Sequence, residues 1–393
     1  MKKSLVSISV LLISCLLPIS GFPWSSLKRL TWNSGMSICP DITCSSVSGT
    51  HVVWVDDSSG NYEIYYKVST DGGTTWSAPD RLTWNTGQSE FPSIASFSNS
   101  SGGIVHVVWH DDTFGPAEIF YKRSTNGGTT WAGLNRLTWN PGWSLYPSIA
   151  AESANIIRMV WSDYTPGNYE IFYKHSLDSG ITWTGNKRLT WNSSGSGDPV
   201  IACNSSSGIH VVWVDYLSGD AEIYYKKSTD GGTSWTGLTR LTWNSGNSWN
   251  PSIAVDSGNG VYVVWYDYSP GSPEIYYKGS TDGGTTWSAL TRLTWSSGSS
   301  QFPDITTDSN DNIHVVWHDY TPGTGDIFYK YSTDSGSTWS GNIRLTWNTG
   351  NSGYASIIVD PGSAVKVVWQ DDTPGNKEIF YKDCEFSAAK KIF

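Results

Sequence analysis

The sequence predicts an all-β protein, a seven-bladed β-propeller made of four-stranded antiparallel blades. The tetrapeptide Arg-Leu-Thr-Trp occurs seven times, at intervals of 52 residues in five cases and 55 in the sixth. Three further short apolar segments, separated by Gly-rich turns, follow each copy. The composition, with 23 Trp, 21 Tyr and 40 Gly, favours strands and tight turns over helices.

Each repeat is expected to contain four strands, A to D, counted outward from the ring axis. Strand A begins at a Pro, such as Pro40, and strand B ends in a Trp, such as Trp54. Strand C has the pattern Glu-Ile-Tyr-Tyr-Lys, as in residues 63–67, and strand D is the Arg-Leu-Thr segment. The segments are apolar on both faces, which suits blades packed between two neighbours.

The order of the strands predicts how the ring closes. The chain begins with a lone strand D at Arg29 and ends with a set of strands A, B and C that finishes at Lys382. Neither fragment can satisfy its edge hydrogen bonds alone. We therefore expect the N-terminal strand D to pair with the C-terminal strand C and complete the seventh blade.

Three segments are expected along the chain: a signal peptide over 1–21, the propeller over 22–384 and a tail over 385–393. Lys2 and Lys3 precede an apolar stretch that is too short to span a bilayer. The protein is thus predicted to be secreted, or held at the cell surface or in the periplasm. An alternative is a lipoprotein box over 12–15, through which Cys15 would be acylated and attached to a membrane.

The charge and cysteine patterns exclude several classes of partner. The formal charge is −10, and no cluster of Lys or Arg offers a footprint for nucleic acid or an anionic membrane surface. Cys44 and Cys203 occupy the same position of two different repeats, and no CxxC spacing occurs. Four of the seven His occupy one strand B position in different blades. No disulfide framework, metal site or cofactor is therefore predicted.

A second motif lies between strands C and D, as in Ser-Thr-Asp-Gly-Gly-Thr-Thr-Trp over 69–76. Its third position is occupied by Asp71, Asn126, Asp178, Asp230, Asp282 and Asp334. These six turns resemble the Asp-box (BNR) repeats of the sialidase-like propeller superfamily, over nearly all of the chain after the signal peptide. The six residues are interpreted as structural, because the side chain can accept N–H bonds across the turn and Asn126 keeps that acceptor without a charge.

The resemblance implies a test for sialidase activity. Sialidases of this superfamily are six-bladed and use three axial arginines, a Tyr–Glu nucleophile and an Asp acid/base. Seven of the nine Arg here belong to the outermost strands, and the other two are Arg123 and Arg158. No three are expected to meet at the axis, so no catalytic residue is assigned. A sialidase-like glycoside hydrolase remains the alternative if this protein is an enzyme.

Ligand contacts are expected on the face that carries the D–A and B–C connections. The residues just before the Pro of strand A differ strongly between blades and should surround the axial mouth. The candidate ligand-binding residues are Glu90, Trp143, Tyr146, Asp198, Trp249 and Asn250. For Tyr146, as for Phe91 and Phe302, packing beside the Pro is the alternative.

The B–C loops repeat an Asp and a Glu, such as Asp56 and Glu63, for which two interpretations stay open. Either the carboxylates form a charge-paired network inside each blade, or they line the rims of as many as seven equivalent sugar sites with Trp platforms. The function predicted from the sequence is non-catalytic binding of carbohydrate or an extracellular glycoprotein. A protein-interaction or adhesion platform is a further alternative.

Overall fold

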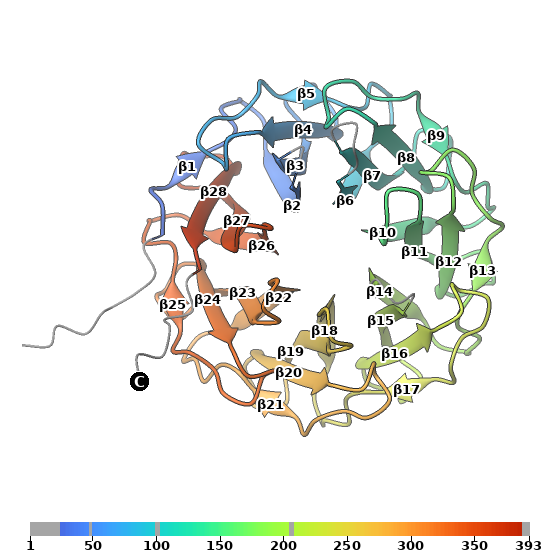
Figure 1. Ribbon diagram of the computed structural model, residues 1–393, viewed down its shortest axis with the longest axis vertical. Helices are drawn as coiled ribbons and strands as arrows, with labels where there is room; N and C mark the ends of the chain where they lie inside the picture. The colour runs from blue at the N-terminus through green and yellow to red at the C-terminus, as the bar shows by residue number, and fades with distance from the viewer. Residues whose placement is uncertain (1–23, 47–48, 99–102, 204–207, 387–393) are drawn as a thin grey trace, which may run out of the picture.

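The computed structural model describes residues 24–46, 49–98, 103–203 and 208–386. The predicted signal peptide, Cys15 and residues 387–393 lie outside this part of the chain. Twenty-eight strands form seven four-stranded antiparallel sheets, arranged as blades around a central axis (Figure 1). No helix long and apolar enough to cross a bilayer occurs among the described residues. The prediction of an all-β, seven-bladed propeller is confirmed.

The strands follow the expected order from the axis outward. The innermost strands are β2 (Ser37–Ser45), β6 (Ser89–Phe97), β10 (Ser144–Ala151), β14 (Ser196–Cys203), β18 (Ser248–Val255), β22 (Ser300–Thr307) and β26 (Ser352–Val359). The second strands are β3 (Gly49–Asp56), β7 (Ile104–Asp111), β11 (Ile157–Asp163), β15 (Ile209–Asp215), β19 (Val261–Asp267), β23 (Ile313–Asp319) and β27 (Ala364–Asp371).

The outer half of each blade holds one long and one short strand. The third strands are β4 (Glu63–Ser69), β8 (Glu118–Ser124), β12 (Glu170–Ser176), β16 (Glu222–Ser228), β20 (Glu274–Ser280), β24 (Asp326–Ser332) and β28 (Glu378–Glu385). The outermost strands are β1 (Lys28–Arg29), β5 (Asp80–Arg81), β9 (Asn135–Arg136), β13 (Lys187–Arg188), β17 (Thr239–Arg240), β21 (Thr291–Arg292) and β25 (Ile343–Arg344).

The outermost strands are shorter than the Arg-Leu-Thr segment suggested. In the seventh blade, Leu30 N still donates to Ile379 O (2.7 Å), but Ile379 N donates to the Thr31 hydroxyl (2.8 Å) rather than to a backbone carbonyl. The Thr side chain thus takes the place of a backbone acceptor, which ends the strand without leaving the N–H unpaired. The same side-chain bond recurs in the other blades, as from Ile64 N to Thr83 Oγ1.

The ring closes between the two ends of the chain, as predicted. Strand β1 pairs antiparallel with β28, with Lys28 opposite Tyr381 and Arg29 opposite Phe380. Ser25 N adds a bond to Asp383 O at 2.7 Å. In Figure 1 the blue strand β1 lies beside the red strand β28. The seventh blade is therefore built from β26, β27, β28 and β1.

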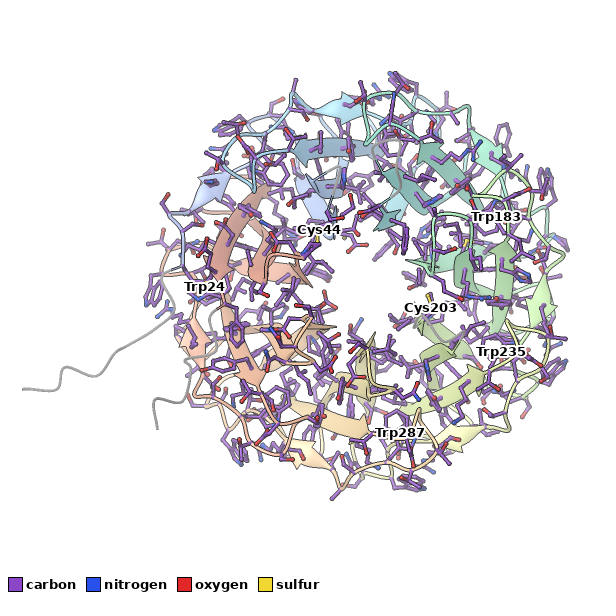
Figure 2. The ribbon with its side chains drawn as sticks, viewed as in Figure 1. Trp24, Cys44, Trp183, Cys203, Trp235 and Trp287 are labelled. Atoms are coloured by element: carbon purple, nitrogen blue, oxygen red, sulfur yellow. The ribbon has the colours of Figure 1, made fainter. Side chains whose placement is uncertain are left out.

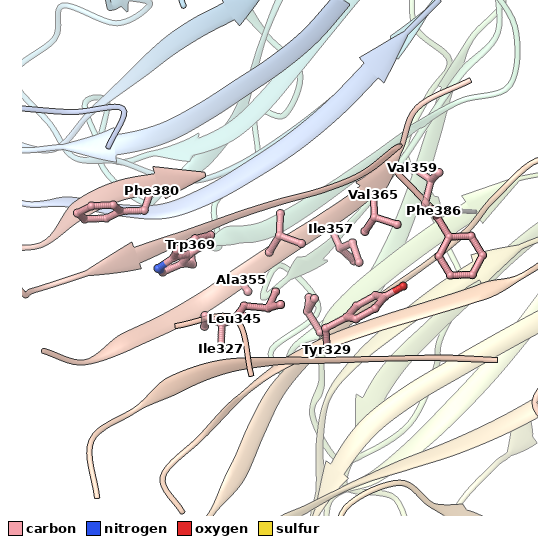
Figure 3. Close-up of a cluster of buried hydrophobic side chains, with 12 residues drawn as sticks. Ile327, Tyr329, Leu345, Ala355, Ile357, Val359, Val365, Trp369, Phe380 and Phe386 are labelled. Carbon is pink, nitrogen blue, oxygen red and sulfur yellow. The ribbon is translucent and has the colours of Figure 1, made fainter. Parts of the chain in front are cut away.

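The hydrophobic core lies between neighbouring blades. Two residues before its end, each second strand carries a buried Trp, at most 1% exposed, whose ring stacks on an aromatic ring of the third strand at 5.8 to 6.3 Å. One cluster joins Ile327 and Leu345 of the sixth blade to Ile357 and Trp369 of the seventh (Figure 3). Because each blade is covered on both sides, apolar residues occupy both faces of its strands.

Four His at equivalent positions of the second strands have a structural role in this core. His51, His106, His210 and His314 each lie 2.6 to 2.7 Å from the hydroxyl of a buried Tyr on the third strand. Burial lowers the pKa of His51 and His210 to about 4. These imidazoles are therefore neutral at pH 7, and they lie in four different blades.

The repeated Arg and Glu form ion pairs within each blade. Arg29 Nη2 lies 2.7 Å from Glu378 Oε1, and the equivalent pairs, including one Arg–Asp pair, lie at 2.5 to 2.8 Å. The acidic partners are almost fully buried, at 2% exposed or less. The Asp at the end of each second strand is also used internally, since Asp56 accepts bonds from the Ser37 hydroxyl and the Trp54 indole. The B–C carboxylates thus form a network inside the blades.

Candidate functional site

The innermost strand of every blade begins with a bulge that turns one side chain toward the axis. Pairing with the second strand shifts register here, as between Ile38 and Asp41 in the first blade. The residue before the Pro, or before Ala355 in the last blade, has φ between 46° and 51° in all seven blades. These residues are Cys39, Phe91, Tyr146, Asp198, Asn250, Phe302 and Tyr354.

These seven residues surround a cavity of about 490 Å³ at one end of the axis. Phe91 and Tyr146 form one aromatic pair, with ring centroids 4.8 Å apart, and Phe302 and Tyr354 form a second at 4.6 Å. In ring order, Asp198 and Asn250 separate the two aromatic pairs on one side and Cys39 separates them on the other. The mouth therefore presents two apolar walls with a polar pair between them.

One His packs against each aromatic pair, and it lies on the second strand of the blade that supplies the Phe of that pair. His110 contacts Phe91 and Tyr146, with ring centroids 5.4 and 5.7 Å away, and its Nδ1 accepts a bond from Tyr146 N at 3.4 Å. Its Nε2 lies 3.7 Å from a Glu90 carboxylate oxygen. The backbone bond makes Nδ1 the acceptor, so Nε2 carries the proton and points at Glu90.

The second His, His318, is packed between aromatic rings. Its ring lies 5.0 Å from Phe302 and 5.3 Å from Tyr320, and it is 3% exposed. Neither ring nitrogen makes a hydrogen bond within the described part of the chain. Burial lowers the pKa of His318 to about 4, so the ring is neutral at pH 7.

Below the mouth, a ring of small and acidic side chains follows the Pro positions. These residues are Asp41, Ser93, Ser148, Val200, Ser252, Asp304 and Ser356. Asp41 and Asp304 come from the first and sixth blades and flank the seventh. Ser356 of the seventh blade lies between them, with its hydroxyl oxygen 3.0 Å from Asp41 Oδ1 and 3.2 Å from Asp304 Oδ2.

The two carboxyls are held by backbone groups of neighbouring blades. Asp41 Oδ2 accepts a bond from Ile94 N (2.9 Å), and Asp304 Oδ2 accepts one from Ile357 N (2.9 Å). Burial has the largest effect on the pKa of Asp41 and raises it. The backbone bond from Ile94 lowers this pKa and the charge of Asp304 raises it, and the net result is a pKa of about 6. Burial also raises the pKa of Asp304. A Ser hydroxyl has one proton to donate, so two ionised carboxylates cannot both be satisfied by Ser356.

The structure brings three of the six candidate ligand-binding residues into the cavity wall. Tyr146, Asp198 and Asn250 line it. Burial raises the pKa of the Asp198 carboxyl. The other three occupy different positions nearby: Glu90 lies beside His110, Trp143 is 52% exposed, and Trp249 packs on Tyr216 with centroids 5.7 Å apart.

Sequence analysis did not single out the acidic pair or the second aromatic pair. Among the seven residues that follow the Pro positions, Asp41 and Asp304 are the two acidic ones, and this difference between repeats was visible in the sequence. Phe91, Phe302 and Tyr354 were visible as variable residues before the Pro. What the pattern did not reveal was that the bulge turns them into the mouth.

All nine arginines lie in described residues, and none lines the axial cavity. Seven form the outer ion pairs described above. Arg123 Nη1 donates to Ser179 O at 2.8 Å, and Arg158 pairs with Glu152 and with the Tyr173 hydroxyl. The three-arginine carboxylate grip that the resemblance implies has no counterpart in this mouth.

The four cysteines in the described part of the chain form no crosslink. Cys39, Cys44, Cys203 and Cys384 are all free. Figure 2 shows Cys44 and Cys203 near the axis in different blades. Burial raises the pKa of each thiol to about 12, so the reactive thiolate is scarce at pH 7.

The six Asp or Asn turns lie on the opposite face from the mouth. Asp71 Oδ1 accepts bonds from Thr75 N (2.8 Å) and from the Ser69 hydroxyl (2.9 Å). Asn126 Oδ1 accepts the equivalent bond from Thr130 N at 2.9 Å. These side-chain hydrogen bonds lower the pKa of Asp71 to about 2. Every acceptor is used within its own turn.

The Trp that ends each such turn packs against the preceding blade. Figure 2 shows Trp183, Trp235 and Trp287 in the ring. Their rings meet Tyr121, Tyr173 and Tyr225 edge-on, with centroids 5.0 to 5.2 Å apart. The turns therefore link neighbouring blades.

Comparisons with known proteins show the fold. No family model matches the chain, and no curated protein matches it. An ulvan lyase, described as a new family of polysaccharide lyase, matches 90% of this chain and 95% of its own, with a TM-score of 0.65 and 10% identity. A protein of unknown function from Dyadobacter fermentans matches 92% of this chain and 99% of its own, with a TM-score of 0.54 and 13% identity.

The NanB sialidase from Streptococcus pneumoniae, as its K499G mutant, matches 91% of this chain and 70% of its own. The TM-score is 0.51 and the identity 14%. The chain therefore has a sialidase-like propeller fold. At these identities, the likeness carries no residue of one site into the other.

Proposed function

We propose that this protein is a secreted or surface-held binding propeller that recognises carbohydrate at the axial mouth and does not cleave it. The observation that supports this best is the arrangement of the mouth, with the Phe91–Tyr146 and Phe302–Tyr354 pairs on either side of Asp198 and Asn250. Aromatic faces pack well on sugar C–H groups, and carboxylate and amide groups bind hydroxyls. The names of the similar structures, sialidase and polysaccharide lyase, also point to carbohydrate.

The proposal includes the finer features expected from the sequence. The six turns at Asp71 and its equivalents are assigned as structural Asp-box repeats. Residues 1–21 are assigned as an export signal, with acylation of Cys15 as the alternative. Glu90, Trp143 and Trp249 are retained as contacts for parts of a ligand that extend beyond the mouth.

A glycoside hydrolase is the second candidate, because two carboxyls lie together below the mouth. A carboxyl such as Asp41, whose pKa is raised to about 6, holds a proton closer to neutral pH and could act as an acid beside Asp304. Release of reducing sugar from the bound glycans, lost in Asp41→Asn and Asp304→Asn, would support hydrolysis. Binding without release supports the first proposal.

A glycan array with the full chain tests the binding proposal. We expect the wild type to bind at least one class of oligosaccharide. Phe302→Ala and Asp198→Ala should each weaken that binding by about tenfold, since each removes one wall or one polar contact. The matched control is Ile181→Ala, which removes a side chain that is 62% exposed on the opposite face and should change nothing.

The binding proposal fails if the wild type binds no glycan, or if Phe302→Ala and Asp198→Ala bind as the wild type does. Thermal unfolding of each variant accompanies the array. It separates a lost contact from a lost fold.

A further inference from the structure

The outer edge of the mouth face carries seven exposed indoles. They belong to the Trp of each Arg-Leu-Thr-Trp repeat and are 64 to 71% exposed: Trp32, Trp84, Trp139, Trp191, Trp243, Trp295 and Trp347. We call this set the rim tryptophans. Large apolar side chains left in water at seven equivalent positions are unusual in a protein whose second-strand Trp are fully buried and whose turn Trp are partly buried.

Each rim tryptophan is held in place by cations. The guanidinium of the Arg three residues earlier lies 5.6 to 5.9 Å from the ring centroid in all seven repeats. In five repeats, a Lys of the next blade adds a second cation at 5.0 to 5.7 Å, as Lys67 does over Trp32. Because the arginines are fixed by their own bonds, the indole is preorganised as a flat surface.

A cavity of about 320 Å³ lies beside Trp32, between the seventh and first blades. Its apolar lining includes Trp32, Tyr65 and Pro79, and its polar lining includes Asn33, Asp56 and Lys67. The Lys67 ammonium already donates to Leu30 O at 2.6 Å, and Asp56 is buried in its network. This cavity therefore offers mainly aromatic and Pro surface to a ligand.

One polar group beside each rim tryptophan remains available to a ligand. Arg29 donates through Nε to Thr31 O (2.6 Å) and through Nη2 to Glu378 (2.7 Å). Its Nη1 makes no hydrogen bond to any described residue, and the side chain is 27% exposed. The other six rim arginines use the same two nitrogens for the same two kinds of partner. A free donor thus lies beside each exposed indole.

We propose that the rim tryptophans form a multivalent surface for polysaccharide, distinct from the axial mouth, in which each rim tryptophan binds one pyranose unit. The sugar ring packs on the exposed indole, and the Arg Nη1 donates to a hydroxyl or carboxylate oxygen of that unit. Seven exposed indoles at equivalent positions around one ring suit a ligand made of repeating units. The residues four positions after the rim tryptophans differ between blades, as Met36 and Gln88 do, whereas the Trp and Arg are identical in all seven.

The test is affinity electrophoresis of the full chain in native gels that contain polysaccharide. The probes are hydroxyethylcellulose, glucomannan and xylan as neutral polymers, and polygalacturonate and alginate as polyuronates. We expect at least one polymer to retard the wild type. Retardation by the neutral polymers assigns the Arg donor to a hydroxyl, and retardation by the polyuronates alone assigns it to a carboxylate. If no polymer retards the wild type, the proposal is wrong.

A graded series of variants tests multivalency. Trp191→Ala should weaken apparent binding by about twofold or less, whereas a variant with Trp84, Trp191 and Trp295 all replaced by Ala should weaken it by about tenfold or more, because avidity depends on the number of linked sites. A second triple variant with Leu in place of Ala keeps apolar cover over the arginines but removes the flat ring. We expect it to lose binding to the same extent.

Two controls separate the rim from the mouth and from folding defects. Phe302→Ala should leave retardation unchanged even if it abolishes oligosaccharide binding, so the two proposals can fail independently. In the unmodified protein, the retarding polymer should protect tryptophan fluorescence from acrylamide quenching, which requires no variant to fold. Retention of wild-type retardation by the Ala and Leu triple variants, or absence of protection, would overturn the rim proposal.

Discussion

At the scale of single residues, backbone conformation decides which side chains meet at the axis. Cys39, Phe91 and their equivalents have left-handed φ values although they carry a Cβ. Such a conformation costs on the order of 1 kcal/mol or more per residue, and the ring contains seven of them. The bulge that imposes it also directs seven different side chains into one cavity. The strain and the site therefore have the same origin.

Asp41 predicts a pH dependence of stability. Its folded-state pKa is raised to about 6 from 3.8, so the folded protein binds this proton more tightly than the unfolded chain does. The contribution of Asp41 to stability is then greatest below about pH 4, and it falls by on the order of 3 kcal/mol as pH rises to about 6. In Asp41→Asn this part of the loss should be absent. Urea unfolding of both proteins across this range measures it, and parallel pH profiles would contradict the prediction.

At the scale of the secondary-structure element, each turn and strand end supplies its own hydrogen-bonding partners. The Thr hydroxyl replaces a backbone acceptor at the end of each outermost strand, and the Asp or Asn side chain closes the turn before it. In the second turn, Gly128 has a φ of 85°, and a Cβ there would overlap the Tyr66 hydroxyl of the preceding blade. These local devices are repeated because every blade has the same two interfaces to satisfy.

The turn at Asp230 gives a prediction about charge. Asp230 Oδ1 accepts a bond from Ser234 N at 2.8 Å and one from the Ser228 hydroxyl at 2.8 Å. Asp230→Asn keeps this acceptor, as Asn126 does naturally, so its melting temperature should stay close to that of the wild type. Asp230→Ala removes the acceptor and should melt lower. Differential scanning calorimetry compares the three proteins, and equal melting of the Asn and Ala variants would show that the acceptor does not matter.

The outer ion pair of the closing blade gives a second element-level prediction. Glu378 is fully buried, and Arg29 and the backbone N–H of Asn33 are its partners. Arg29→Ala leaves that carboxylate without a counter-charge and should lower the free energy of unfolding by about 3 kcal/mol. Chemical unfolding measures the change. Arg188→Ala is the matched variant in the third blade, and we expect a similar loss there because the pair with Glu170 has the same geometry.

At the scale of the whole molecule, the two ends of the chain hold the ring closed. Strand β1 supplies the fourth strand of the last blade, and Lys67 of the first blade donates to Leu30 O beside it. The N-terminal segment thus contacts both the seventh and the first blade. No other outermost strand connects the two ends of the chain.

Removal of this segment should destabilise the ring more than a side-chain change does. A chain that begins at Asn33 lacks β1, so the edge of β28 and the core around Leu30 are exposed. We expect its melting temperature to be lower than that of Arg29→Ala, with a greater tendency to associate. Calorimetry and light scattering check both. A truncated chain as stable as the full one would mean that closure adds little.

The sequence alone determined the architecture of this protein. Seven copies of one repeat, the order of strands within it and the incomplete blades at the two ends are all local or periodic features, and local features can be read without coordinates. Tyr146, Asp198 and Asn250 could be placed at the mouth for the same reason, because they precede a recurring Pro.

Tertiary structure alone decided which residues act together. Asp41, Asp304 and Ser356 are far apart in the chain and become neighbours because the ring brings the first, sixth and seventh blades to one axis. Glu90, Trp143 and Trp249 precede the same Pro positions but point elsewhere, since a bulge turns only the residue next to the Pro into the cavity. The exposure of the rim tryptophans depends on packing between blades, which the repeated tetrapeptide does not encode by itself.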